Sequence, residues 1–318
     1  MKMNLKLTLA VCAIFSGSTL AHAGGEGWSH DFEASKKLAA KEGKVMLVDF
    51  TGSDWCGWCI KLNEEVFSHD EFKEGVKDGY VLVELDYPSD KSKLSAETIA
   101  QNEKLQEEYS VTGFPTILLL DGEGRPFAKT GYQPGGPVKY VEHLDELSTL
   151  KTARDEAFGK AAELEGVEKA KALVAALGSM ELDEALVASF YSGQIDAIKA
   201  ADPSDESGYI KGIEMKAKFA DYQAEVNRLG SEGDFPGAMK LTEETIATGG
   251  FQGGMAQELV FMKAMIHAQT GEMDKTLEAL DASEKIEPGS ELGKRISVIR
   301  PQIIEKMKEA AADKEPAE

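Results

Sequence analysis

The stretch VMLVDFTGSDWCGWCIKL at residues 45–62 joins an apolar run to a run with helical spacing, and two cysteines lie at the junction. The first part predicts a buried strand and the last part the start of a helix. At a helix N-terminus, unpaired backbone N–H groups and the positive end of the helix dipole stabilise a thiolate. Because the thiolate attacks disulfides, we expect Cys56 to be the nucleophile. Cys59 lies one turn later on the same face, so we expect it to resolve the mixed disulfide.

A Cys-x-x-Cys pair has other uses, which the rest of the sequence makes less favourable. A structural disulfide would join separated elements, and a structural zinc site needs four ligands, commonly two such pairs. The third cysteine, Cys12, lies in the N-terminal segment, and the five histidines are scattered. We therefore expect a redox pair with no metal and no cofactor. The alternative is a partner-binding protein whose two thiolates form a copper site or a tether.

Length and charge limit the possible classes of protein. A chain of 318 residues is long enough for about two domains. The formal net charge of -21 disfavours binding to nucleic acid or to anionic membrane surfaces, which need basic patches. Beyond the N-terminus, the sequence has no apolar run long enough to cross a bilayer. We expect no nucleic-acid partner and no stable membrane insertion.

The N-terminus has the pattern of a signal peptide. Positive charge in the first six residues is followed by an apolar run to Leu20 and by Ala21-His22-Ala23, which fits a small-x-small cleavage site. We therefore predict a signal peptide at 1–23 and export to the periplasm, or alternatively secretion. A lipoprotein signal at Cys12 is the weaker alternative, because the apolar run continues past that cysteine. Disulfides persist in exported proteins.

Apolar runs, turn residues and helical spacing predict the elements on both sides of the cysteines. Strand and helix alternate, and a hairpin and a helix then follow, which predicts an α/β fold with a mixed sheet and helices on both faces. The predicted strands are 45–51, 80–86 and 125–131, with a further strand that follows a turn within 111–120, and the predicted helices are 28–43, 60–67, 95–109 and 137–150.

Two motifs in this region resemble the thioredoxin family. They are Trp55-Cys56-Gly57-Trp58-Cys59 after an apolar strand, and Phe114-Pro115-Thr116 at the start of a later strand. The resemblance covers about residues 28–150, and it extends to the C-terminal domain of the bacterial membrane thiol:disulfide interchange reductase. It implies a thioredoxin-like fold, thiol:disulfide oxidoreductase activity and a cis Pro115 whose backbone binds an extended substrate beside Cys56. The remaining motif residues are expected to contact substrate: Trp55, Gly57, Trp58, Phe114 and Thr116.

Asp49 matches the buried acid that assists the second cysteine of thioredoxins. A carboxyl buried beneath a sheet should have a raised pKa and could move a proton near neutral pH. The alternative is an aspartate that faces solvent from an alternating strand. The sequence also departs from the family pattern: the loop before the cysteines is one residue longer, Trp58 replaces the usual proline, and 88–98 resembles an insertion. These differences would change reduction potential and substrate choice.

Beyond Leu150 the strand-like runs end and helical spacing dominates. We therefore predict a thioredoxin-like domain at 24–150 and an all-α domain at 151–318 with a flexible C-terminal tail. Helix starts at Gly233 and Gly271 echo each other at an offset of 38 residues, which resembles tetratricopeptide repeats, although an ordinary helical bundle is an alternative. We expect this part to select clients, and a chain ending near Leu150 to fold and react.

The residues between the cysteines bear on the direction of electron flow. Gly57 and Trp58 supply no cation, and Asp54 adds negative charge nearby, so the thiolate of Cys56 should be only moderately stabilised. We therefore expect a reducing protein, with a potential nearer about -270 mV than about -120 mV. Its partners would be client proteins with disulfides or thiols, and a membrane thiol reductase would recharge it.

Overall fold

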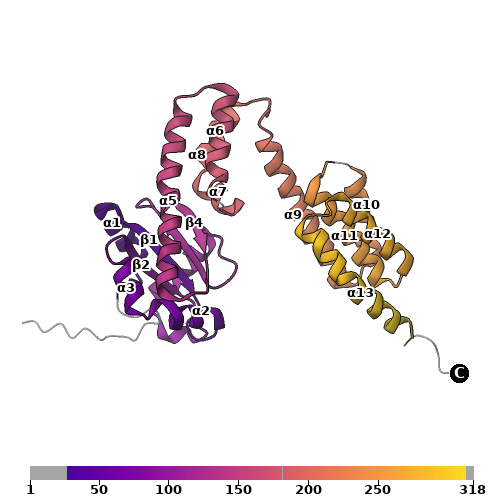
Figure 1. Cartoon of the computed structure of the whole chain (residues 1–318), viewed down its shortest axis with the longest axis horizontal. Helices are drawn as coiled ribbons and strands as arrows, with labels where there is room; N and C mark the ends of the chain where they lie inside the picture. Colours follow the sequence, from indigo (N-terminus) through magenta and orange to yellow (C-terminus); the bar gives the residue numbers. More distant parts are fainter. Residues whose placement is uncertain (1–26, 181, 249, 313–318) are drawn as a thin grey trace, which may run out of the picture. The chain divides into compact units, whose positions relative to one another are not determined.

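The computed structural model describes residues 27–312 except 181 and 249, and Figure 1 shows the chain coloured along its sequence. The predicted signal peptide at 1–23 and the last six residues of the predicted tail lie outside the described residues. The chain divides into two compact units, of which the first ends at Ser204 and the second begins at Asp205. We call them unit 1 and unit 2.

Unit 1 contains a four-stranded mixed sheet, as the sequence predicts. Its order is β2-β1-β3-β4, with β1 parallel to β2 and antiparallel to β3, and with β3 antiparallel to β4. β1 lies in the interior of the sheet and is buried from its second residue to its last, because both of its edges are paired and both of its faces are covered. The strands are β1 (Val45–Thr51), β2 (Tyr80–Asp86), β3 (Thr116–Leu120) and β4 (Pro126–Thr130).

Helices cover both faces of this sheet. On one face, apolar residues of α1 and α4 pack against alternate residues of β1, including Met46, Val48 and Phe50. On the other face, α5 packs against α3 and β4, and Tyr140 contacts the rings of Phe67 and Phe72. These helices are α1 (Phe32–Glu42), α2 (Gly57–Leu62), which continues as the π-helix η1 (Asn63–Phe67), α3 (Asp70–Val76), α4 (Ala96–Glu108) and α5 (Gly136–Ala162), and the short 3₁₀ helix η2 (Lys91–Lys93) precedes α4.

The boundary of unit 1 lies beyond the predicted boundary at Leu150. Helix α5 runs through that position, and three further helices follow within the same unit. Leu186 of α7 joins the apolar core of the sheet, and the ring of Phe190 stacks on Tyr109 with centroids 4.7 Å apart. The three helices are α6 (Gly166–Gly178), α7 (Glu184–Phe190) and α8 (Ser192–Ala201).

The part of α5 beyond Leu150 and the helices α6 to α8 form what we call the helical extension. A buried ion pair also joins this helical extension to the sheet. The guanidinium of Arg154 donates to Asp121 Oδ2 at 3.0 Å and to the hydroxyl of Tyr191 at 2.9 Å. The same hydroxyl donates to the carbonyl of Pro126 at the start of β4, at 2.7 Å. A chain ending near Leu150 lacks all of these contacts. This is a physical reason to expect that it does not fold, contrary to the expectation from sequence.

Unit 2 consists of helices that pack in sequential order, each against the next. Gly233 and Gly271 end α9 and α11 with φ values of 77° and 80°. In each case the next N–H donates to the carbonyl five residues back, from Asp234 to Leu229 and from Glu272 to His267, both at 2.9 Å. The repeated signal in the sequence thus corresponds to two turns of the same kind. The helices are α9 (Tyr209–Glu232), α10 (Phe235–Ala247), α11 (Gly253–Gln269), α12 (Met273–Ile286) and α13 (Glu291–Ala312).

Candidate active site

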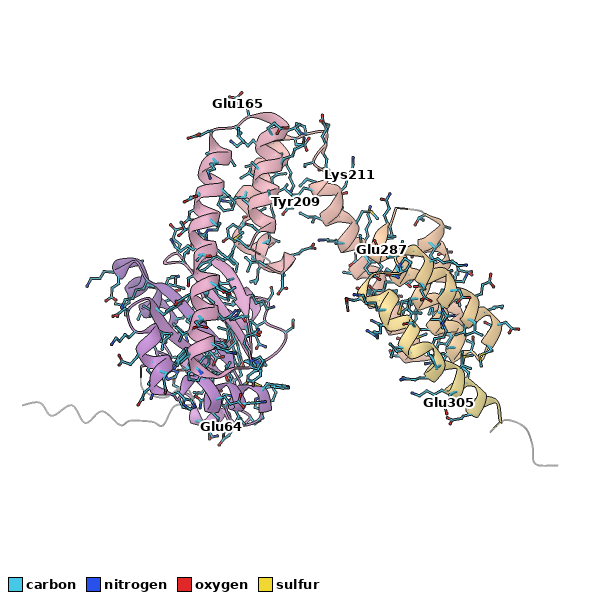
Figure 2. The ribbon with its side chains drawn as sticks, in the orientation of Figure 1. Glu64, Glu165, Tyr209, Lys211, Glu287 and Glu305 are labelled. Atoms are coloured by element: carbon cyan, nitrogen blue, oxygen red, sulfur yellow. A yellow bond between two sulfur atoms is a disulfide. The ribbon has the colours of Figure 1, made fainter. Side chains whose placement is uncertain are left out.

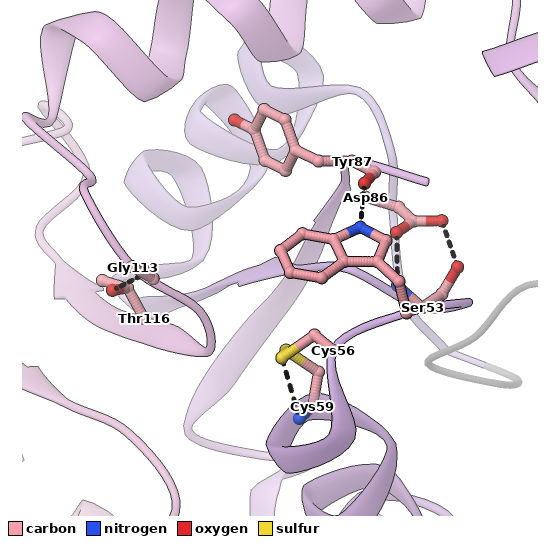
Figure 3. The surroundings of a disulfide bond; sticks show 8 residues. Ser53, Cys56, Cys59, Asp86, Tyr87, Gly113 and Thr116 are labelled. Carbon is pink, nitrogen blue, oxygen red and sulfur yellow. Dashed lines mark hydrogen bonds between the residues drawn. A yellow bond between two sulfur atoms is a disulfide. The ribbon is translucent and has the colours of Figure 1, made fainter. Parts of the chain in front are cut away.

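Cys56 and Cys59 form a disulfide at the start of α2, directly after the strand β1 and its loop (Figure 3). Cys56 is the N-cap residue, and its sulfur accepts the backbone N–H of Cys59 at 3.2 Å. That N–H is one of the unpaired donors of a helix start, so the site stabilises negative charge on the Cys56 sulfur. The two cysteines are 6% and 3% exposed in the disulfide form, so exposure alone does not distinguish the attacking thiol from the resolving one.

The loop before the cysteines is held from two sides. The N–H of Cys56 donates to the carbonyl of Gly52 at 2.9 Å. Ser53 donates twice to the carboxylate of Asp86 at the end of β2, from its N–H at 2.9 Å and from its hydroxyl at 2.6 Å (Figure 3). A Cβ atom on Gly52 would lie 2.6 Å from the ring of Trp55, so this close approach requires glycine. These contacts accommodate the longer loop that the sequence shows.

The cis-proline loop lies against this site through an aromatic contact. The peptide bond between Phe114 and Pro115 is cis, as the family resemblance implies. The ring of Phe114 meets Trp55 edge to face with centroids 5.7 Å apart, and the indole N–H of Trp55 donates to the carbonyl of Tyr87 at 2.8 Å. The hydroxyl of Thr116 donates to the carbonyl of Gly113 at 2.8 Å, closing the turn (Figure 3).

A second aromatic surface is formed by Trp58, between the two cysteines, and Tyr132. The side chain of Trp58 is 57% exposed, and its ring lies 5.1 Å from that of Tyr132. The ammonium of Lys61 lies over both rings, at 5.1 Å and 4.9 Å from their centroids, and the hydroxyl of Tyr132 donates to Glu65 at 2.6 Å. Sequence reasoning finds Trp58 but misses Tyr132, because no local pattern indicates that a residue after β4 reaches the helix α2.

Asp49 is buried, at 4% exposure, so the structure excludes an aspartate that faces solvent. Burial raises the pKa of its carboxyl well above the usual value, and the charges of Glu84 and Asp86 raise it further. Asp49, Cys59 and Glu84 line one cavity of about 160 Å³. Sequence reasoning missed Glu84, whose only signal is an acidic residue between apolar residues of β2.

Asp54 is not an uncompensated charge, which corrects the expectation from sequence. Its carboxylate accepts the N–H groups of Ser89 at 2.8 Å and Asp90 at 3.4 Å, and the ammonium of Lys93 at 3.0 Å. These contacts, led by the hydrogen bond from Ser89, lower the pKa of Asp54. The insertion at 88–98 is therefore attached to the loop that carries the cysteines, and its lysine offsets the negative charge beside Cys56.

Two further properties bear on the class of protein. Within the described ranges, no group of three or more histidine, cysteine or acidic side chains is arranged to hold a metal ion. Among the described helices, none combines the length and the apolar composition that crossing a membrane requires.

Comparisons with known proteins agree with this site. A family model for a thioredoxin-like domain matches residues 32–144. The disulfide bond reductase DsbH of Chlamydia pneumoniae is 34% identical over 158 residues, which are 46% of this chain and 92% of that protein. The thioredoxin-related protein DsbJ of the same organism is 31% identical over 105 residues, 33% of this chain and 30% of that protein.

A third relative is the thiol:disulfide interchange protein DsbD of Actinobacillus pleuropneumoniae, which is 26% identical over 98 residues. These are 31% of this chain and 15% of that protein, so the likeness to DsbD concerns a small part of its length. The match to DsbH spans nearly all of that protein. The chain therefore belongs to the thioredoxin-like family of thiol:disulfide oxidoreductases, and its Cys56–Cys59 pair fits the Cys-x-x-Cys site of that family.

Proposed function

We propose that this protein reduces disulfides of exported client proteins by cycling Cys56 and Cys59 between dithiol and disulfide. The observation that carries this proposal is the disulfide at the start of α2, where the Cys56 sulfur accepts a backbone N–H of the helix. A sulfur held in this way is a good attacking and leaving group. The name of the relative DsbH, a disulfide bond reductase, supports the direction.

The proposed reaction has two steps. In the first, the thiolate of Cys56 attacks a client disulfide, a bond forms between Cys56 Sγ and one client sulfur, and the other client sulfur leaves as a thiolate. In the second, Cys59 gives its proton to Asp49 and attacks Cys56 Sγ. The bond between Cys56 Sγ and the client sulfur attached to it breaks, that sulfur leaves as a thiolate, and the Cys56–Cys59 disulfide forms. Two electrons pass from the dithiol to the client.

Client binding is assigned to the surfaces around the cysteines. An extended client segment would pair with the backbone beside Pro115, in the manner of an added strand. The exposed rings of Trp55 and Trp58 offer apolar contact area with polar edges. Gly57 leaves room beside the sulfur, since a Cβ atom there would meet nothing within 4 Å. Phe114 and Thr116 shape the cis-proline turn and complete this surface.

We propose that electrons flow from the Cys56–Cys59 dithiol to the client disulfide, so that the protein acts as a reductant. Neither Gly57 nor Trp58 supplies a cation between the cysteines, so the reduced form gains less stabilisation than in strong oxidants. Titration of the purified protein against glutathione should give a potential near about -270 mV, and a value more positive than about -170 mV would show an oxidant instead. In the periplasm, to which the predicted signal peptide would direct the chain, a membrane thiol reductase would regenerate the dithiol.

The roles of the two cysteines are tested by trapping. Cys59→Ser should accumulate mixed disulfides through Cys56, because the resolving thiol is gone, whereas Cys56→Ser should trap none. If the Cys56→Ser variant is alkylated near neutral pH as fast as the Cys59→Ser variant, the assignment is wrong. If neither variant nor the parent protein exchanges with a protein disulfide, a partner-binding protein with a copper site or a tether is the better description.

Unit 2 is assigned to client selection. Its part of the sequence holds no cysteine, and its helices pack in series, an arrangement that offers extended surfaces to partner proteins when helix pairs repeat. We also propose that the two helix pairs joined at Gly233 and at Gly271 are tetratricopeptide-like. Removing unit 2 should then lower the rate with a folded client protein and leave the rate with a small disulfide unchanged.

A further inference from the structure

Two buried carboxyl groups face the same cavity below the disulfide. Asp49 on β1 and Glu84 on β2 are direct register partners in a parallel pair, and register partners on neighbouring parallel strands point to the same side of the sheet. They are 4% and 2% exposed, and both line the cavity that Cys59 also lines. The proposed reaction uses Asp49 but gives no role to Glu84.

The surroundings of this pair are poor in positive charge. Asp86 on β2 and Tyr140 on α5 interact electrostatically with Asp49, and Glu64 on η1 lines the same cavity. None of the described residues that line the cavity is a lysine or an arginine. The ring nitrogen Nδ1 of His30 lies 3.9 Å from the carboxylate of Glu84. The charge of Glu84 therefore adds to burial in raising the pKa of Asp49.

The cavity also gives the pair a route to water. Oδ1 of Asp49 and Oδ1 of Asn63 are buried without a hydrogen-bond partner among the described residues, and both residues line the cavity. Its volume of about 160 Å³ exceeds what one water needs, and polar oxygens are the partners that water requires. A proton taken up by the pair can therefore pass to water in this space and out to solvent.

We propose that Glu84 is a positioning residue for the proton step: its carboxylate raises the proton affinity of Asp49 and thereby sets the pH at which Asp49 takes the proton of Cys59. The inference rests on the proposed two-step reaction. In the second step the Cys59 S–H bond breaks, its proton goes to the Asp49 carboxylate, and its electron pair forms the bond to Cys56 Sγ as the client thiolate leaves. A carboxylate of higher proton affinity is a stronger base toward a thiol.

The test follows the resolving step in the full chain. Reduced protein is mixed with an excess of a small aromatic disulfide, whose thiolate absorbs light. A first phase reports attack by Cys56 and a second phase reports displacement by Cys59. The rate of the second phase is measured from acidic to alkaline pH for the parent protein, Glu84→Gln, Asp49→Asn and the double variant. Glu64→Gln is the matched control, because Glu64 lines the same cavity but its side chain is exposed at the surface (Figure 2).

We expect Glu84→Gln to shift the midpoint of the second phase to lower pH, since a like charge beside Asp49 is gone, and Glu64→Gln to leave it in place. Glu84→Asp keeps the negative charge, so it should have the midpoint of the parent protein. This variant separates the loss of charge in Glu84→Gln from any disturbance of the fold. The Asp49→Asn variant should lose this pH dependence, and adding Glu84→Gln to it should change nothing more. The inference is overturned if Glu84→Gln follows the parent profile, or if its shift persists without Asp49. Loss of the first phase in the parent protein would instead contradict the proposed function itself.

Discussion

The two compact units bury different kinds of polar side chain. Unit 1 buries ionisable groups, which include Asp49, Glu84, Asp121 and Arg154. Apart from His267, whose Nδ1 lies 2.6 Å from a carboxylate oxygen of Glu272, the buried polar side chains of the described part of unit 2 are amides and hydroxyls. These have partners within the unit, and they are Thr242, Gln257, Thr276 and Ser283.

The comparison shows that buried charged groups in unit 1 either hold helices on the sheet or suit proton transfer. The buried polar groups of unit 2 do neither. The guanidinium of Arg154 donates hydrogen bonds both to Asp121 and to Tyr191, so this pair holds the helical extension on the sheet. Asp49 has one oxygen without a partner among the described residues and a raised pKa, which suits proton transfer. A buried neutral group such as Gln257 needs only hydrogen bonds, so it fixes how helices pack and adds no redox chemistry.

The largest effect should come from cutting unit 1 inside its helical extension. A chain ending at Leu150 loses Arg154, Leu186 and Tyr191, which removes one of the two guanidinium groups that pair with buried Asp121 and uncovers part of the apolar core. We expect no cooperative unfolding transition in this fragment, whereas a chain ending at Ser204 should unfold cooperatively. Tryptophan fluorescence measures this directly, because Trp28, Trp55 and Trp58 all lie in unit 1. A cooperative transition in the shorter fragment would show that the extension is a separate part.

A smaller effect should follow from removing the buried guanidinium alone. Arg154→Met should lower the free energy of unfolding of unit 1 by about 3 kcal/mol, because it leaves a buried carboxylate with less compensation. Arg228→Met is the matched control. Arg154 pairs with Asp121 and Asp155, and Arg228 pairs with Glu225 and Glu232 but is half exposed in unit 2. Exposed pairs contribute about 0–1 kcal/mol. The free energy of unfolding in urea is measured for each variant in the unit that carries the substitution. If both variants lose the same free energy, the contrast between buried and exposed ion pairs is contradicted.

The smallest effect concerns pH and has a defined sign. The pKa of Asp49 is raised in the folded state, so the folded protein binds the proton more tightly, and stability falls as pH rises from the unfolded pKa through the folded one. Asp49→Asn should therefore unfold at higher urea than the parent at pH 7, and at a similar urea concentration near about pH 4. Asp54, whose pKa is lowered, should behave oppositely: Asp54→Asn loses stability at pH 7 and little in acid. A shift of Asp49→Asn that does not depend on pH would exclude the burial of charge as its cause.

The sequence predicts the parts of the fold that local patterns determine. The bounds of β1 and β2 agree with the predicted strands, and α10 and α12 begin two residues after Gly233 and Gly271, where the repeated signal places helix starts. The cysteine pair at a helix start and the cis bond before Pro115 are also confirmed. Each of these follows from residues adjacent in the chain or from a motif of a few residues.

The features that sequence reasoning missed depend on packing between distant segments. The composition changes near Leu150 because strands end there, but Arg154 continues to pack on the sheet, so the unit ends only at Ser204. The break at 201–204 is visible in the sequence, yet nothing local marks it as the unit boundary. Glu84 reads as one acidic residue in a strand, and only the register with Asp49 shows that it belongs to the site.

The most direct measurement compares the rate at which the full chain and a chain ending at Ser204 reduce the same small disulfide. Both carry Cys56, Cys59, Asp49 and Arg154, and tryptophan fluorescence confirms beforehand that unit 1 is folded in each. We expect the same kcat/KM for both, because every group that takes part in the proposed reaction lies in unit 1. A folded shorter chain with a clearly lower kcat/KM would contradict the claim that unit 1 alone performs the redox chemistry.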